Sequence, residues 1–153
     1  MNKIIFLFCI TFVFITASQA QNKNQYDSVL AKKLGADQYG MRKYVIVLLK
    51  PGQTKITDTV KRKELFEGHM KNIERLANEG KLAIAGPFLG KGPYSGIFIF
   101  SVATVEEAKA LVDTDPAIKA GVFEMEAHLW YGSAALMQVV ETHDKLQKKG
   151  ILE

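Results

Sequence analysis

The sequence predicts an α+β domain of the ferredoxin-like type, in which strands and helices follow the order β-α-β-β-α-β. Three observations support this fold. Short runs of β-branched and aromatic residues alternate with longer segments of helical periodicity. Glycine and proline separate the segments. Two of the strand-like runs are adjacent, between the two helices. We therefore expect a four-stranded antiparallel sheet with both helices on one face, followed by a C-terminal helix.

The first half of the domain contains two strands and one helix. Residues 44–49 are aliphatic on both faces of the first strand, and Pro51 and Gly52 stop it. A helix is predicted over residues 60–79, and the glycine that follows it is typical of a helix C-terminus. Residues 81–85 form the second strand, which closes at another glycine and proline.

The second half repeats this pattern. Residues 96–102 form a strand with isoleucines on one face and phenylalanines on the other. Thr104 and Glu107 form a capping box that opens the second helix, because each side chain can bond the other's free amide. Residues 122–131 alternate in polarity and form the fourth strand. The last helix is predicted over residues 133–149.

The first twenty residues are expected to be a cleaved signal peptide. Lys3 gives a positive start, residues 4–16 are apolar, and residues 17–20 place small side chains where signal peptidase cuts. The apolar run is shorter than the about 20 residues that a membrane span needs. We expect cleavage after Ala20 and export to the periplasm or the cell exterior. An uncleaved membrane anchor is the alternative.

The exported chain is expected to have three parts. Residues 21–40 are polar and form a flexible lead with a short helix over Ser28–Leu34. Residues 41–132 form the folded domain, and residues 133–153 form the C-terminal helix. The one cysteine, Cys9, lies within the signal peptide, so the exported chain has neither thiol nor disulfide chemistry.

Composition narrows the class of protein. Of the 153 residues, 48% are hydrophobic and 24% are charged, as in a globular protein with one domain. Removing Lys3 with the signal lowers the net charge from +4 to +3, and the basic residues are scattered. We therefore expect no nucleic-acid partner, and no stable membrane association once the signal is cleaved.

His69 is the most informative side chain, because it lies on the apolar stripe of the first helix. That stripe also contains Leu65, Phe66, Met70, Ile73 and Leu76. The glycine before it, Gly68, costs a helix about 1 kcal/mol relative to alanine and indicates a close approach of backbone or ligand. An imidazole there suits general acid or base catalysis. The alternative is a core histidine that bonds a backbone carbonyl.

Asp115 stands directly before Pro116 at the end of a helix, and it has two interpretations. It can cap local backbone amides, as most aspartates before proline do. It can also orient the ring of His69 in a catalytic pair.

Metal binding is a weaker interpretation. Glu124, Glu126 and His128 share one face of the fourth strand, and with His69 they would offer nitrogen and oxygen ligands. Solvent-facing strand residues have the same spacing, so we expect no metal.

The face of the sheet without helices predicts a partner. The first and third strands carry apolar residues on both faces, so one copy alone would expose a large apolar patch. Burial of apolar surface stabilises by about 25 cal/mol per Å². We therefore expect a symmetric homodimer whose sheets face each other.

Several residues together resemble the YCII-related domain family over residues 42–131. In the first half these are His69, residues 76–82 and residues 85–87; in the second they are Gly96, residues 104–108, Asp115, Pro116, residues 121–123, Glu126 and Trp130. The resemblance implies the dimeric α/β barrel superfamily, with an active site built around His69 and Asp115. Two positions depart from the family pattern: Phe66 replaces a frequent arginine, and residues 90–92 replace acidic residues.

The first functional hypothesis is a small-molecule enzyme that uses His69 as base and Asp115 as its partner. Proton transfer of the isomerase or lyase type would suit one base without a cofactor, and the ligand would be a small organic molecule. The alternative is a non-catalytic ligand-binding or accessory dimeric domain. The sequence leaves open whether the protein is catalytic at all.

Overall fold

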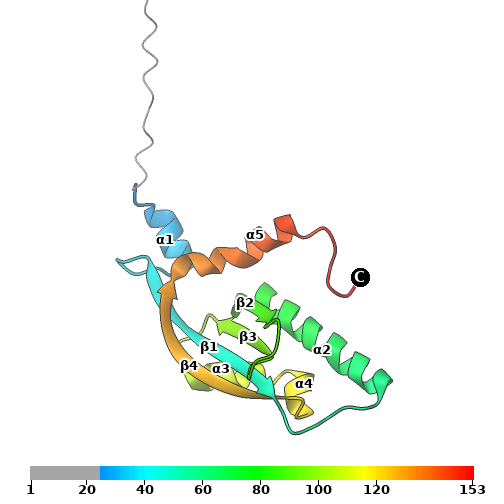
Figure 1. Ribbon diagram of the computed structural model, residues 1–153. Helices are drawn as coiled ribbons and strands as arrows, with labels where there is room; N and C mark the ends of the chain where they lie inside the picture. The colour runs from blue at the N-terminus through cyan, green and yellow to red at the C-terminus, as the bar shows by residue number, and fades with distance from the viewer. Residues whose placement is uncertain (1–24) are drawn as a thin grey trace, which may run out of the picture.

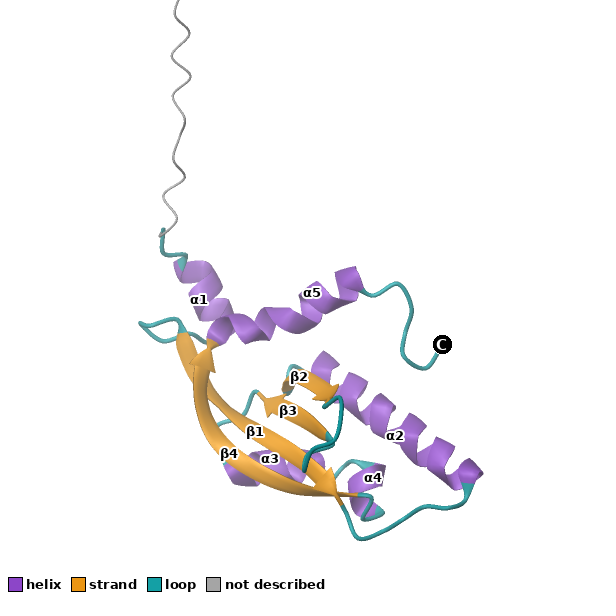
Figure 2. Ribbon diagram, viewed as in Figure 1, coloured by secondary structure: helices purple, strands orange, loops and turns teal. Residues whose placement is uncertain are grey.

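The computed structural model describes residues 25–153, so the expected signal peptide and its cleavage point lie outside the described residues. Figures 1 and 2 show the elements in chain order. They are α1 Ser28–Leu34, β1 Met41–Pro51, α2 Thr59–Asn78, β2 Leu82–Pro87, β3 Gly96–Phe100, α3 Val105–Val112, α4 Pro116–Lys119, β4 Phe123–Ser133, the 3₁₀-helix η1 Ala134–Gln138 and α5 Val139–Leu146.

The four strands form one antiparallel sheet in the order β2-β3-β1-β4, which confirms the ferredoxin-like fold. The two strands of 11 residues, β1 and β4, run as long curved ribbons along one side of the sheet (Figure 1). Their pairing extends from Met41 opposite Ser133 to Pro51 opposite Phe123. β3 pairs with the middle of β1 only, from Val45 opposite Phe100 to Leu49 opposite Gly96.

The first face of the sheet carries the main core, under α2, α3 and α4. Alternation along β1 and β3 brings every second side chain to this face. The buried residues are Val45, Val47, Leu49, Leu76, Leu82, Phe98, Phe100, Ala108 and Val112. Both faces of β1 and β3 are apolar, as the sequence predicts.

The second face is not bare, and this part of the expectation is wrong. Leu136 and Met137 of η1 pack against Tyr44 and Ile99, which are buried. The Tyr44 hydroxyl donates a hydrogen bond of 2.9 Å to the carbonyl oxygen of Ser133, at the end of β4. Because η1 follows β4 without a loop, the chain turns back directly over the sheet. Farther along this face, side chains are only half-buried, among them Ile46, Leu48 and Ile97.

Of the two terminal segments, the one at the C-terminus differs from its prediction. The predicted helix over residues 133–149 is two elements, η1 and α5, and it ends at Leu146. Within the lead, the predicted short helix over Ser28–Leu34 is confirmed. Arg42 donates to the carbonyl oxygen of Leu34 at 2.9 Å, and the Tyr131 hydroxyl donates to Asp37. These two bonds attach the end of α1, and the loop that follows it, to strands β1 and β4 of the sheet.

The other boundaries differ from the sequence predictions by at most three residues, the largest difference being at the start of β1. The N-cap of α2 is Asp58, whose carboxylate accepts from the amides of Val60 and Lys61 at 2.8 and 3.1 Å. Among the described helices, none has the length and apolar character to cross a membrane.

Candidate functional site

His69 lies between α2 and the sheet. Its ring centroid is 6.0 Å from that of Phe98 on β3 and 5.6 Å from that of Phe123 on β4. One and two turns farther along α2, Ile73 and Leu76 pack into the main core. The apolar stripe of the helix therefore faces the sheet, and the imidazole lies beside the two phenylalanine rings.

Asp115 is fully buried at the N-terminus of α4. Its Oδ1 accepts a hydrogen bond of 2.8 Å from the backbone amide of Ala117, which makes it the N-cap of that helix. Its Oδ2 lies 2.6 Å from Nδ1 of His69. The prediction that Asp115 caps local amides is confirmed, and the same side chain contacts His69 with its other oxygen.

Gly68 sets the distance between α2 and α4. A Cβ atom at this position would lie 2.7 Å from Cγ of Pro116, closer than side chains tolerate. The absence of a side chain lets α2 approach α4, and this approach brings His69 within hydrogen-bonding distance of Asp115. The close approach that the sequence indicates at Gly68 is confirmed.

The donor and the acceptor in the contact between His69 and Asp115 can be assigned. An ionised carboxylate accepts hydrogen bonds, and both oxygens of Asp115 have a nitrogen partner. Nδ1 of His69 is therefore the donor in this bond, and in the neutral ring Nε2 has the lone pair. Within residues 25–153, Nε2 has no hydrogen-bond partner, and no buried side-chain nitrogen or oxygen is left unpaired. The His69 side chain is 13% exposed, so Nε2 is the edge of the ring that reaches solvent.

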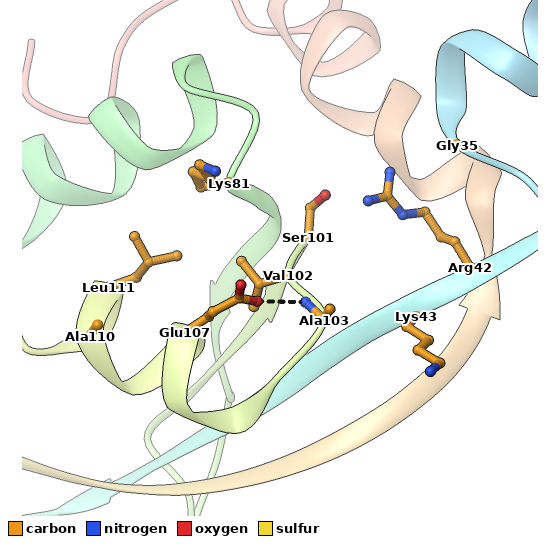
Figure 3. A pocket seen from close by; sticks show the side chains of 10 residues that line it. All are labelled: Gly35, Arg42, Lys43, Lys81, Ser101, Val102, Ala103, Glu107, Ala110 and Leu111. Atoms are coloured by element: carbon orange, nitrogen blue, oxygen red, sulfur yellow. Dashed lines mark hydrogen bonds between the residues drawn. The ribbon is translucent and has the colours of Figure 1, made fainter.

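Two cavities in the described structure do not include His69. One, of about 600 Å³, lies where α1, β1 and α3 meet (Figure 3). The other, of about 340 Å³, is lined by Thr59, Arg62, Lys63 and Phe66, which precede His69 on α2. Neither of these two cavities is lined by the His69–Asp115 pair.

The sequence profile of the YCII-related domain matches residues 43–130, more than half of the chain. The chain belongs to the YCII-related domain family. The resemblance in the sequence is confirmed, and the fold agrees with it. The two residues that the resemblance singled out, His69 and Asp115, are in direct contact in this YCII-related domain.

One solved structure with a similar chain is the 5-chloro-2-hydroxyhydroquinone dehydrochlorinase of Burkholderia phenoliruptrix in complex with 2,5-dihydroxybenzoquinone. The two chains are 23% identical, with a TM-score of 0.43. The alignment covers 58% of this chain and 93% of the dehydrochlorinase. A search of curated proteins finds no match to the sequence.

The metal interpretation that combined His69 with the acidic strand is wrong for this YCII-related domain, because the sheet lies between them. Glu126 and His128 stand opposite Leu48 and Ile46 on the second face, whereas His69 is on the first. His128 Nε2 lies 2.7 Å from Glu126 Oε1. In the part of the chain that the structure describes, no three histidine, cysteine or acidic side chains are grouped as metal ligands.

Glu126 pairs instead with Lys50, on the neighbouring strand. The hydrogen bond from the Lys50 ammonium, with a smaller contribution from His128, lowers the pKa of the Glu126 carboxyl. The same bond raises the pKa of Lys50. These exposed contacts form a surface charge network on the second face.

Sequence reasoning missed the basic side chains that line the larger cavity of the YCII-related domain. Arg42 and Lys43 come from β1, whereas Lys81 comes from the turn before β2, and they share no motif. Only the tertiary fold brings them together, so no local pattern could have indicated this site.

Proposed function

We propose that this protein is a small-molecule enzyme that catalyses proton transfer of the isomerase or lyase type. His69 is the base, and Asp115 positions it. The contact of 2.6 Å between Nδ1 and Oδ2 supports this proposal, because it joins a fully buried carboxylate to a partly exposed imidazole.

The geometry suits a single base that takes and returns one proton. Nε2 accepts a proton from a C–H or O–H group of the substrate, whose electron pair forms an enolate or expels a leaving group. Asp115 accepts the Nδ1 hydrogen bond throughout, so it stabilises the positive charge that forms on the ring. Nε2 then returns the proton to a second position on the substrate or to the departing group. A positioned general base typically contributes about 10²–10⁴-fold in rate.

Exchange in deuterated water tests this proposal even while the substrate is unidentified. The protein is incubated with a panel of ketones, keto acids and enols, and loss of each C–H signal is followed by NMR. The wild-type protein should accelerate exchange for at least one class of compound. His69→Gln should lower that rate by about 10²-fold or more, because no base remains. Unchanged exchange in His69→Gln would exclude His69 as the base.

The tautomer of His69 gives a second, independent readout. In protein labelled with ¹⁵N, the Nδ1–H form should predominate, because Asp115 accepts that proton. Asp115→Asn should mix the two tautomers and slow exchange, while circular dichroism shows the fold retained. A wild-type ring with its proton on Nε2 would contradict the assigned polarity.

A non-catalytic, ligand-binding or accessory domain remains the second candidate. It is favoured by the low exposure of the His69 side chain, 13%, and by the two cavities, neither of which includes that residue. A compound from the panel that binds tightly but never exchanges its protons would support this candidate.

We also propose that the half-buried part of the second face pairs with a second copy of the chain. Ile46, Leu48 and Ile97 form its apolar surface, and Trp130 beside them is 38% exposed. Leu48→Glu should therefore give a monomer in analytical ultracentrifugation. Leu129→Glu is the matched control, because Leu129 lies on the opposite face of the sheet and is 62% exposed. A monomeric wild-type protein at micromolar concentration would contradict the pairing.

Export through a cleaved signal at residues 1–20 is proposed from the sequence. Mass spectrometry of the protein recovered outside the cytoplasm should find a chain that begins at Gln21. Recovery of a membrane-bound chain that keeps Lys3 would support a retained anchor instead.

A further inference from the structure

We propose that the larger cavity binds the oxyanion group of a small organic molecule, a carboxylate or a phosphate ester, at a site separate from His69 and Asp115. The cavity has a volume of about 600 Å³ and is built by four segments: the end of α1, the start of β1, the turn before β2, and the segment from β3 into α3 (Figure 3). Its volume is in the range of known small-molecule sites.

The cavity exists because β3 leaves the sheet before β1 does. β1 pairs with β4 as far as Met41, but its pairing with β3 ends where Val45 stands opposite Phe100. Beyond Phe100 the chain turns away to form α3. The first residues of β1 therefore have a neighbouring strand on one side only, and the cavity fills the gap on the other.

The charge of the lining is positive. Arg42, Lys43 and Lys81 line the cavity, and within the described residues none of the three forms an ion pair. The one acidic residue of the lining, Glu107, already accepts hydrogen bonds from the amides of Ala103 and Thr104 at 2.9 and 3.2 Å. Its carboxylate therefore closes the capping box of α3, and the lining keeps an excess of positive charge. In Figure 3 the Arg42 side chain reaches toward Ser101, whereas Lys43, the next residue of β1, points to the other side of the strand.

Arg42 is held in place before any ligand arrives. Its Nη1 donates to the carbonyl oxygen of Leu34, and its guanidinium lies 5.3 Å from the centre of the Tyr44 ring. The other nitrogens of the guanidinium have no protein acceptor among the described residues. A planar, fixed guanidinium is suited to carboxylate and phosphate groups. In Figure 3 the Ser101 hydroxyl lies between Lys81 and Arg42, where it can donate to the same anion.

This site and the catalytic pair occupy opposite ends of the sheet. His69 contacts Phe98, which is paired through β3 with Val47 of β1, and Phe123, which stands opposite Pro51, whereas Arg42 is at the start of β1. Five to nine residues of strand at about 3.3 Å each place the two sites about 15–30 Å apart. Anion binding at the cavity can therefore be tested independently of the proposed proton transfer.

The test is an NMR titration of the ¹⁵N-labelled protein with inorganic phosphate and, separately, with acetate. Sodium chloride at equal ionic strength is the reference. We expect saturable shifts of the backbone amides of Lys43, Ser101 and Ala103 with at least one of the two anions. Saturation by phosphate alone identifies a phosphate ester as the ligand class, and saturation by acetate identifies a carboxylate.

Two variants show whether the cavity is responsible. Lys81→Gln should weaken binding about tenfold, because it removes a charged donor, and Ser101→Ala should weaken it by a smaller factor. Lys71→Gln is the matched control, since Lys71 is an exposed lysine of α2 outside the cavity. Lys81 is also exposed, so its replacement should leave the fold intact. The proposal is overturned if chloride reproduces the shifts, or if Lys81→Gln binds as tightly as Lys71→Gln.

Discussion

Gly68→Ala tests the geometry that brings His69 to Asp115 without changing either residue. In an unobstructed helix, alanine in place of glycine would stabilise the protein by about 1 kcal/mol. Here the new Cβ would lie 2.7 Å from Cγ of Pro116, whereas carbon atoms normally approach to about 3.5–4.0 Å. The proline ring must therefore move by about 1 Å, and overpacking of this kind costs about 1–3 kcal/mol. The expected net change is a loss of up to about 2 kcal/mol.

Urea denaturation followed by circular dichroism measures this change, and Pro116→Ala provides the control. Alanine at position 116 removes the ring atoms that obstruct the new Cβ. In that background, Gly68→Ala should recover the helical gain of about 1 kcal/mol, so the two substitutions should be coupled. If Gly68→Ala stabilises the protein equally in both backgrounds, α2 and α4 do not meet at this glycine and the reasoning fails.

The same variant should also disturb the contact between His69 and Asp115. Asp115 immediately precedes Pro116, so a displacement of α4 carries the carboxylate away from Nδ1. The ¹⁵N spectrum of His69 should then show a larger share of the Nε2–H tautomer. Gly92→Ala is the matched control, because a Cβ there would meet nothing within 4 Å.

Three further predictions concern the segments around the sheet. The Tyr131 hydroxyl lowers the pKa of Asp37, and that bond raises the pKa of Tyr131. The hydrogen bond between Tyr131 and Asp37 therefore stabilises the fold near neutral pH. This stabilisation is lost in acid as Asp37 protonates, and in alkali as Tyr131 ionises. Tyr131→Phe should be less stable than wild type only between these limits, as thermal unfolding at a series of pH values can show; a constant difference would contradict this. Tyr44→Phe should cost about 1 kcal/mol in urea, because the Ser133 carbonyl loses its donor, and an unchanged midpoint would exclude that bond. Leu136→Ala should cost about 2 kcal/mol and increase binding of a hydrophobic dye, because η1 covers the second face; no loss would mean that η1 does not cover it.

The elements of the domain could be predicted because their signals are local. Alternating apolar residues, a capping box at Thr104 and glycines at helix ends each act over a few residues, and the structure has the elements where these signals place them. His69 could be found because a polar ring on an apolar stripe conflicts with the pattern around it. Asp115 was harder, since one residue satisfies both a local and a distant partner.

The features that sequence reasoning missed depend on distant segments. The turn from β4 into η1 brings Leu136 and Met137 over the second face, but the sequence shows only a helical pattern there. The basic cavity arises from a difference in strand length between β1 and β3, which no single segment encodes. Side chains that meet only in the folded chain leave no periodic signal in the sequence.

The two oxygens of Asp115 have different partners, the Ala117 amide and the His69 ring, and this has a consequence for genetic experiments. In a deep mutational scan, most replacements at position 115 will fray α4 and release the imidazole simultaneously. Position 115 will therefore tolerate few substitutions, whether the selection is for folding or for activity. Asparagine retains an acceptor for the Ala117 amide while withdrawing the anion from the ring. It is the replacement that can separate loss of folding from loss of the charged contact with His69.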